Sequence, residues 1–338
     1  MMEGLPVNET VRLYVPGTRE PRVVAIGGGH GLSTMLRGLK KYTRNITAIV
    51  TVADDGGGSG MLREDLGMLP PGDIRNCILA LANTEPTMEQ LLNYRFQEGS
   101  LAGQSFGNLF LAAMNGISAS FDEAVYKMGQ VLAITGRVLP VTTQDVYLEA
   151  EFLNGSRCLG ESKIFLAKKA NNSRIKQVRL VPEHPQALPE SLDAIARADL
   201  ILIGPGSLYT SIIPNFLVDG VAEAVSGSTA LKMLIMNIMT QDGETEGCTG
   251  ADHVRALLEH SAPGIVDVCI ANCARIPEQT LIPYREEGVE PLRLERGEIE
   301  AMGIQVREYE LAAGRRYIRH DPEALASAIM EVYRQMRR

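Results

Sequence analysis

The stretch VVAIGGGHGLSTMLRGL, from Val23 to Leu39, limits the fold of this chain more than any other part of the sequence. The apolar run Arg22–Gly27 has the composition of a buried strand, and residues Ser33 to Lys41 suit a helix. A strand that enters a helix through a tight glycine turn is the repeating unit of parallel α/β sheets. We therefore expect a sheet of parallel strands covered by helices.

The rest of the chain continues this alternation. A second strand is expected at Ile46–Asp54, followed by a long loop that ends near Asp73 and by helical segments up to residue 132. The apolar runs LILI, LKMLI and VDVCIAN predict further strands, and Asp321 is expected to cap a last helix that starts at Pro322. The fold class predicted is α/β, with a Rossmann-like, mostly parallel sheet and helices on both faces.

Two regions depart from this pattern. VYLEAEF and CLGESKIF alternate polar and apolar residues on either side of an Asn154–Ser156 turn, which is typical of antiparallel hairpins. We interpret residues 137–181 as a β-rich insertion in a single domain that covers residues 21–338. Residues 1–20 show no period and are expected to be an N-terminal tail.

Composition argues against several classes of protein. The 338 residues carry a formal net charge of -8, and no segment offers the concentrated basic surface that nucleic acids or anionic membranes require. No apolar run is as long as a bilayer span and no export signal is visible, so we expect a cytoplasmic protein without membrane insertion. An odd number of cysteines, five, fits reduced thiols better than a disulfide framework.

The glycine turn after the first strand predicts an anion site. Gly28, Gly29 and Gly31 free the backbone so that its amides can point at a phosphate, to which the helix N-terminus adds partial positive charge. The spacing matches neither the dinucleotide fingerprint, because Leu32 replaces its third glycine, nor a Walker loop. A tight turn without any ligand is the alternative reading.

A second cluster follows the second strand. Asp54 and Asp55 stand at the strand end, where open α/β sheets bind their ligands, and GGGSG follows. The carboxylates can take ribose hydroxyls or a divalent cation. Further along, Asp73 and Arg75 fit either a capped helix with a surface arginine or a site in which the arginine meets a phosphate.

Two more polar loops follow predicted strands. GPGSLYTS, at Gly204–Ser211, combines flexible glycines with hydroxyl groups, and NIMTQDGET begins at Asn237. Because parallel strands end at the same edge of a sheet, these loops should converge with the first two on one crevice. A nucleotide that carries a diphosphate is the ligand that suits such a crevice.

The segments GGGHGLSTMLRGLK, TVADDGGGSGMLREDLGMLPPGDIRNCILALAN, SFGNLFLAA, GPGSLYTSIIPN and NIMTQDGETEG resemble the YvcK family of bacterial gluconeogenesis factors. That family is related to CofD, the 2-phospho-L-lactate transferase of deazaflavin coenzyme synthesis. The resemblance runs from about Val23 to the C-terminus. It implies a Rossmann-like single domain, binding of UDP-sugars such as UDP-N-acetylglucosamine, and a role in carbon metabolism, cell shape and envelope synthesis.

The resemblance also implies a set of site residues. Tyr284 and Arg319 become candidates for holding the uracil or the diphosphate. His30 replaces a threonine that is usual in the family, and Pro322 replaces a threonine that a kinase could modify in some members, which removes that switch here. The expected ligand-binding residues are Gly28, Gly29, His30, Gly31, Leu32, Asp54, Asp55, Gly57, Ser59, Asp73, Arg75, Asn108, Gly204, Gly206, Ser207, Thr210, Ser211, Asn237, Thr240, Tyr284 and Arg319.

Two functions from different classes stay open. No acid and base pair stands out, since His30 and His320 are isolated, and this favours a UDP-sugar-binding regulatory protein without turnover. The alternative is a CofD-like transferase that acts on a nucleotide-activated phosphorylated substrate, with Mg2+ held by Asp54, Asp55 and Asp73. No other cofactor is expected. An envelope-synthesis protein is a conceivable partner, as is a second copy of the chain, but the sequence locates no interface for either.

Overall fold

The computed structural model describes residues 19–314 and 317–337 and is built on one seven-stranded sheet. The strand order is β10-β9-β8-β7-β1-β2-β3, and every neighbouring pair is parallel. The predicted fold class is thereby confirmed. The strands are β1 (Val23–Gly27), β2 (Ile46–Val50), β3 (Arg137–Pro140), β7 (Leu200–Ile203), β8 (Leu231–Ile235), β9 (Val268–Asn272) and β10 (Gln305–Tyr309).

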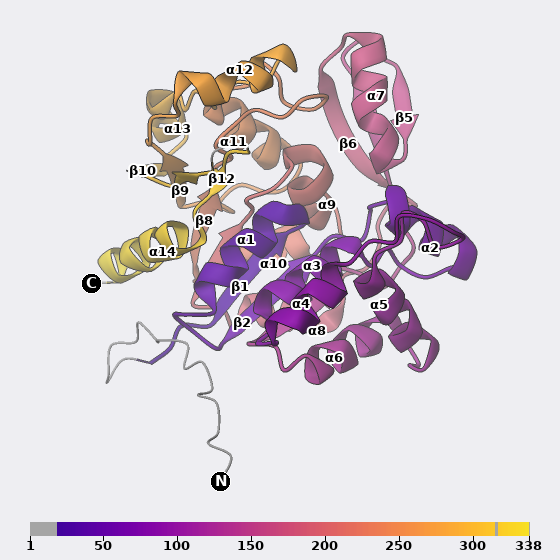
Figure 1. Ribbon diagram of the computed structural model, residues 1–338. Helices are drawn as coiled ribbons and strands as arrows, with labels where there is room; N and C mark the ends of the chain where they lie inside the picture. The colour runs from indigo at the N-terminus through magenta and orange to yellow at the C-terminus, as the bar shows by residue number, and fades with distance from the viewer. Residues whose placement is uncertain (1–18, 315–316, 338) are drawn as a thin grey trace.

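The central strands are apolar because both of their faces are covered. All residues of β1, β2 and β7 are buried, as expected for parallel strands between two layers of helices. On one face α1 (Gly29–Leu39) packs against α3 (Gly72–Leu81) and α14 (Pro322–Met336), and on the other α8 (Pro189–Ala196) packs against α10 (Val221–Gly227) (Figure 1).

The last helix begins as its sequence predicts. The carboxylate of Asp321 accepts hydrogen bonds from the amides of Glu323 and Ala324, and α14 starts at Pro322. The other helices are α2 (Gly57–Leu66), α4 (Pro86–Asn93), α5 (Phe106–Gly116), α6 (Phe121–Val131), α7 (Glu161–Asn171), α9 (Ile213–Phe216), α11 (Gly250–Glu259), α12 (Glu278–Glu286) and α13 (Arg296–Ala301), with a π-helical turn, η1, at Leu208–Ile212.

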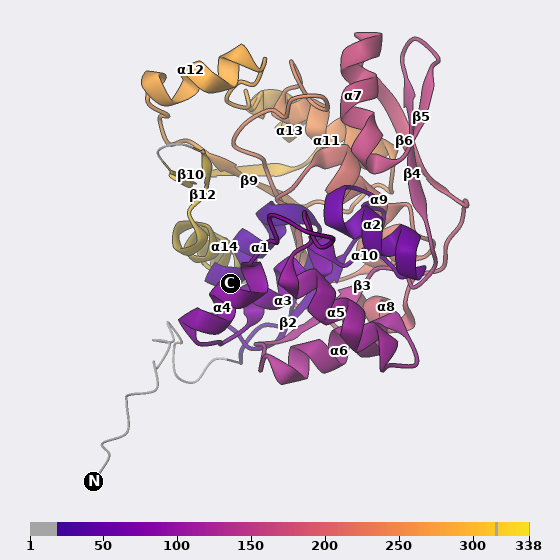
Figure 2. The ribbon, with the colours of Figure 1, turned by 45° about the vertical axis from the view of Figure 1, so that its right-hand side comes forward.

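A second sheet stands beside the first. Strands β4 (Tyr147–Phe152), β5 (Arg157–Leu159) and β6 (Ile175–Val181) pair antiparallel, and α7 covers them (Figure 2). The insertion begins later than predicted, because residues 137–140 pair in parallel with β2 at the edge of the main sheet. The segment ESKIF is helical rather than extended, since it opens α7, in which Ile164 is the one buried residue. A short pair, β11 (Ala312–Ala313) and β12 (Arg319–His320), completes the strands of the described chain.

Three boundaries near the first glycine turn also differ from the prediction. Helix α1 starts at Gly29, within the turn, and β2 ends at Val50 rather than at Asp54. The predicted loop before Asp73 contains α2, which was not predicted because its first residues are rich in glycine, a poor helix former. Most of the predicted tail, residues 1–18, lies outside the described residues, whereas Glu20 accepts a hydrogen bond from the amide of Arg44.

No helix within the described ranges, 19–314 and 317–337, combines the length and the apolar character needed to cross a bilayer.

Candidate functional site

A pocket of about 450 Å³ opens at the carboxyl ends of β1 and β7. These two strands are neighbours in the centre of the sheet, and the chain proceeds from them toward opposite edges. Open α/β sheets bind their ligands at this kind of switch point, because the loops after the two strands diverge and leave a crevice. The position of the pocket therefore follows from the strand order.

The first wall is the glycine turn between β1 and α1. Gly29 has a φ of +68°, a left-handed conformation that glycine adopts without strain. A Cβ at Gly31 would lie 2.5 Å from the carbonyl oxygen of Pro205, so only glycine permits this approach. The turn after β1 is therefore in direct contact with the loop after β7.

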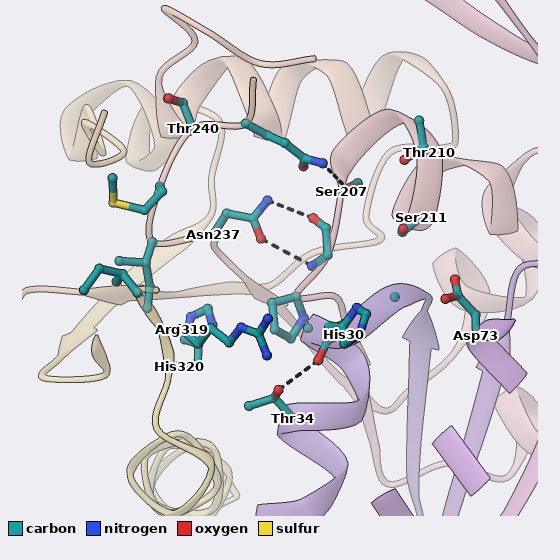
Figure 3. Close-up of a pocket in the computed structure, with 18 of the residues that line it drawn as sticks. His30, Thr34, Asp73, Ser207, Thr210, Ser211, Asn237, Thr240, Arg319 and His320 are labelled. Atoms are coloured by element: carbon teal, nitrogen blue, oxygen red, sulfur yellow. Dashed lines mark hydrogen bonds between the residues drawn. The ribbon is translucent and has the colours of Figure 1, made fainter. Parts of the chain in front are cut away.

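Asn237 fixes the shape of the loop after β7. Its side-chain oxygen accepts from the amide of Gly206 at 3.3 Å, and its side-chain nitrogen donates to the carbonyl of Gly206 at 2.8 Å (Figure 3). Next along the loop, Gln241 donates to the hydroxyl of Ser207 at 2.6 Å. Asn237 and Gln241 both belong to the loop after β8, so this loop holds the loop after β7 in place.

Part of the predicted phosphate cradle is already occupied by a side chain of the protein. The carboxylate of Glu244, which is 6% exposed, accepts from the amides of Tyr209 at 2.5 Å and Thr210 at 3.1 Å. Burial raises the pKa of this carboxyl to about 7, although the two amides oppose the shift. The amides at the start of η1 therefore serve an internal anion, and the amide of Gly29 in the turn after β1 likewise hydrogen-bonds to the carboxyl of Asp73.

Carboxyl groups gather at one end of the pocket. Asp54, Asp73 and Glu161 line it. Burial, together with the charge of Asp54, raises the pKa of Asp73 to about 6 and that of Glu161 to about 8. This end of the pocket thus favours ligand groups that donate hydrogen bonds or carry positive charge.

The predicted trio of metal ligands does not come together. The carboxylate of Asp55 turns away from the pocket and accepts from the amide of Ser162 at 2.8 Å. Across residues 19–314 and 317–337, no group of three or more His, Cys, Asp or Glu side chains is arranged to hold a metal ion. Asp54 and Asp73 still face the same pocket, so a cation there would need oxygens of the ligand or of water to complete its coordination.

The opposite end of the pocket is basic and apolar. Arg319 lies on the far side of His30 from Asp73 in Figure 3. The pKa of the His30 ring is lowered mainly by desolvation and next by the charge of Arg319, so His30 is neutral at pH 7. The apolar side chains on the pocket wall are those of Pro205, Ile238, Met239 and Ile318.

Most of the predicted site residues meet at this pocket, and their roles in binding stay predictions. Those that line it come from six separate segments of the chain. They are Gly29, His30, Gly31, Asp54, Asp73, Gly206, Ser207, Thr210, Ser211, Asn237, Thr240 and Arg319.

Other predicted residues lie behind the lining. Leu32 is completely buried in the core, and the side chains of Arg75 and Asn108 are buried outside the pocket. Tyr284 accepts a hydrogen bond from the amide of Ile318 at 2.6 Å, so it supports the segment that carries Arg319. The predicted residues that do not line the pocket are Gly28, Leu32, Asp55, Gly57, Ser59, Arg75, Asn108, Gly204 and Tyr284.

Several lining residues were missed from the sequence. Gln241 lies inside the NIMTQDGET motif and His320 follows Arg319, so proximity to predicted residues was an available signal. Glu161 carried no such signal, because the insertion brings it to the pocket from a distant part of the chain. The lining residues that were not predicted are Thr34, Glu161, Pro205, Ile238, Met239, Gln241, Ile318 and His320.

Comparisons with known proteins agree along almost the whole chain. The family model described as 2-phospho-L-lactate transferase CofD matches residues 23–312. A protein of Thermoanaerobacterium thermosulfurigenes is 57% identical over 311 residues, which cover 92% of this chain and 96% of that protein. The gluconeogenesis factor of Bacillus subtilis is 46% identical over 319 residues, which cover 94% of this chain and 99% of the relative. A solved structure of a UPF0052 family member from Bacillus halodurans is 42% identical, with a TM-score of 0.88, and the match covers 93% of this chain and 100% of that one.

Proposed function

We propose that this chain, which belongs to the CofD family and to its relatives the bacterial gluconeogenesis factors, binds a UDP-sugar such as UDP-N-acetylglucosamine as a regulatory ligand. One observation carries the proposal: the glycine turn after β1, the loop after β7 and Arg319 line one pocket at the switch point of the sheet. Backbone amides and a guanidinium on one crevice are the donors that a diphosphate requires.

The charges of the pocket favour one orientation of the ligand. The diphosphate would lie between the His30–Gly31 part of the turn and Arg319, because Glu244 takes the amides at the start of η1 and Asp73 takes the amide of Gly29. The sugar would face Asp54, Asp73 and Glu161, whose oxygens accept hydrogen bonds from hydroxyl groups. The nucleobase would then lie toward the apolar side chains at the other end.

The names of the relatives, which describe factors rather than enzymes, favour regulation over turnover. In this proposal the bound UDP-sugar reports the supply of envelope precursors in the cytoplasm, and the protein links gluconeogenic growth to cell shape and envelope synthesis. The signal would pass to an envelope-synthesis protein or act through a homo-oligomer. Neither nucleic acid nor membrane insertion has a part in this function.

A transferase of the CofD kind is the second candidate. It is favoured by the carboxyl groups of Asp54 and Asp73, which face one pocket and whose repulsion a divalent cation such as Mg2+ would relieve. A bound cation would supply charge neutralisation for a transferred phosphoryl group. Mass spectrometry after incubation of a UDP-sugar with the protein and Mg2+ tests this candidate, since cleavage of the ligand by transfer to water supports the transferase and unchanged ligand counts against it.

Substitution of Arg319 tests the proposed binding directly. Arg319→Gln removes the positive charge beside the glycine turn, and we expect it to weaken UDP-N-acetylglucosamine binding by about tenfold to a hundredfold in calorimetry. Arg157→Gln is the matched control, because Arg157 is exposed and pairs with Glu151 outside the pocket. Equal affinities of the two variants would contradict the proposed site.

A further inference from the structure

His320 has a hydrogen-bonding requirement that the protein itself does not meet. The residue lines the pocket and is 8% exposed, yet its Nε2 atom has no hydrogen-bond partner. A buried polar atom without a partner costs roughly 1–3 kcal/mol, so such atoms are uncommon in native structures and need an explanation. A ligand in the pocket that hydrogen-bonds to Nε2 is one such explanation.

The hydrogen bond between the His320 ring and Met236 determines whether Nε2 is a donor or an acceptor. The imidazole donates a hydrogen bond to the backbone carbonyl of Met236, and burial lowers its pKa to about 4, so the ring is neutral at pH 7. A neutral imidazole has one N–H, which the Met236 carbonyl takes. Nε2 is therefore a bare acceptor, and its partner must be a donor.

The surroundings indicate what kind of group carries that donor. Ile318 lies two residues before His320, Ile238 and Met239 follow Met236 closely in the chain, and all three line the same pocket as His320. The pocket's lining carboxyl groups, by contrast, come from the segments at Asp54, Asp73 and Glu161. An apolar wall with one fixed acceptor suits a flat heterocycle that presents a ring N–H, and it suits a sugar with many hydroxyl groups poorly.

We propose that Nε2 of His320 accepts a hydrogen bond from the ring N–H of the nucleobase and thereby selects uracil over cytosine. This inference rests on the proposed function, because it takes a pyrimidine nucleotide as the ligand. Uracil presents an N3–H donor, whereas N3 of cytosine is an acceptor that would face another acceptor. A site built to pair with a donor rejects a ligand that lacks it strongly, because a buried group is then left unpaired.

Calorimetry with three nucleotides tests the inference. For the wild-type protein we expect UDP to bind at least about tenfold more tightly than CDP or N3-methyl-UDP. His320→Phe keeps a ring of similar shape but removes the acceptor, so the three affinities should fall within about threefold of one another. His320→Gln offers both an acceptor and a donor, so it should bind UDP and CDP about equally well, and both more tightly than His320→Phe does.

The ratio of affinities makes the test independent of folding defects, which weaken all three ligands together. Equal binding of UDP and CDP by the wild-type protein overturns the inference, and so does a His320→Phe variant that keeps the wild-type ratio. If His320→Phe weakens UDP-sugar but not UDP, the donor belongs to the sugar and the inference is again wrong. If no uridine nucleotide binds the wild-type protein, the proposed function is wrong as well. If UDP binds but CDP binds equally well, only the inference about His320 is wrong.

Discussion

Gly31 lies so close to Pro205 that a Cβ on the glycine would be 2.5 Å from the proline carbonyl oxygen. This contact joins the turn after β1 to the loop after β7 and brings the two segments to one pocket. Backbone atoms form one side of the contact, so no side-chain rotation can relieve the clash. The shape of the pocket therefore depends on the absence of a side chain at residue 31.

The first prediction concerns this contact. Gly31→Ala should separate the two loops, lower the free energy of unfolding by about 1–3 kcal/mol and weaken nucleotide binding more than tenfold. Gly116→Ala is the control, since a Cβ there meets nothing within 4 Å. Urea unfolding and calorimetry on both variants check the prediction. A Gly31→Ala protein that binds like the control would show that the contact is dispensable.

The second prediction concerns the paired hydrogen bonds between Asn237 and Gly206. Asn237→Asp places an acceptor where the side-chain nitrogen now donates to the Gly206 carbonyl, at 2.8 Å. We expect the aspartate variant to be less stable than wild type by about 1–3 kcal/mol and to be less stable than Asn237→Ala. Thermal unfolding at pH 7 compares the three proteins. Greater stability of the aspartate variant than of the alanine variant would contradict this account of the loop.

The third prediction is a pH dependence that comes from Glu161. Its carboxyl has a pKa of about 8 in the folded protein, against 4.5 for an ordinary glutamate, so folding favours the protonated form. Ionisation of Glu161 therefore costs stability progressively as the pH rises from about 4.5 through 8.

Glu161→Gln should remove that cost. The variant should exceed wild type by about 1–2 kcal/mol in free energy of unfolding at pH 9, with allowance for solvent screening, and the difference should close toward pH 5. Urea titrations at four pH values across this range measure it. A difference that stays constant with pH would mean that the carboxyl is not the cause.

The fourth prediction concerns a structural ion pair far from the pocket. The Asp199 side chain, 10% exposed, accepts hydrogen bonds from the guanidinium groups of Arg22 and Arg337. Burial alone would raise the pKa of Asp199, but its hydrogen bonds with Arg22 outweigh burial and lower the pKa to about 2. The stabilisation is therefore complete above pH 4 and is lost as the pH falls through 2.

Asp199→Asn should then cost about 1–3 kcal/mol at pH 7 and progressively less below pH 4. The control is Asp193→Asn, because Asp193 and Arg197 form an exposed pair that contributes little. Denaturant unfolding at pH 7 and pH 3 gives both values. Equal losses for the two variants at pH 7 would contradict the role assigned to Asp199.

The sheet could be predicted because its central strands are uninterrupted apolar runs, and the pocket because parallel strands end at one edge. The hydrogen bonds from the η1 amides to Glu244 could not be predicted, since no sequence pattern links the two segments that they join. Glu161 reaches the pocket on an insertion whose helix resembled a strand in sequence. What escaped prediction is therefore long-range side-chain placement rather than backbone architecture.

The central claim is that the pocket between the two glycine loops holds a UDP-sugar. Calorimetric titration of the wild-type, Gly31→Ala and Gly116→Ala proteins with UDP-N-acetylglucosamine tests it most directly. The account predicts one ligand per chain with micromolar affinity for the wild-type and Gly116→Ala proteins, and binding that is more than tenfold weaker for Gly31→Ala. No measurable binding to a folded wild-type protein, or undiminished binding to a folded Gly31→Ala protein, would contradict it.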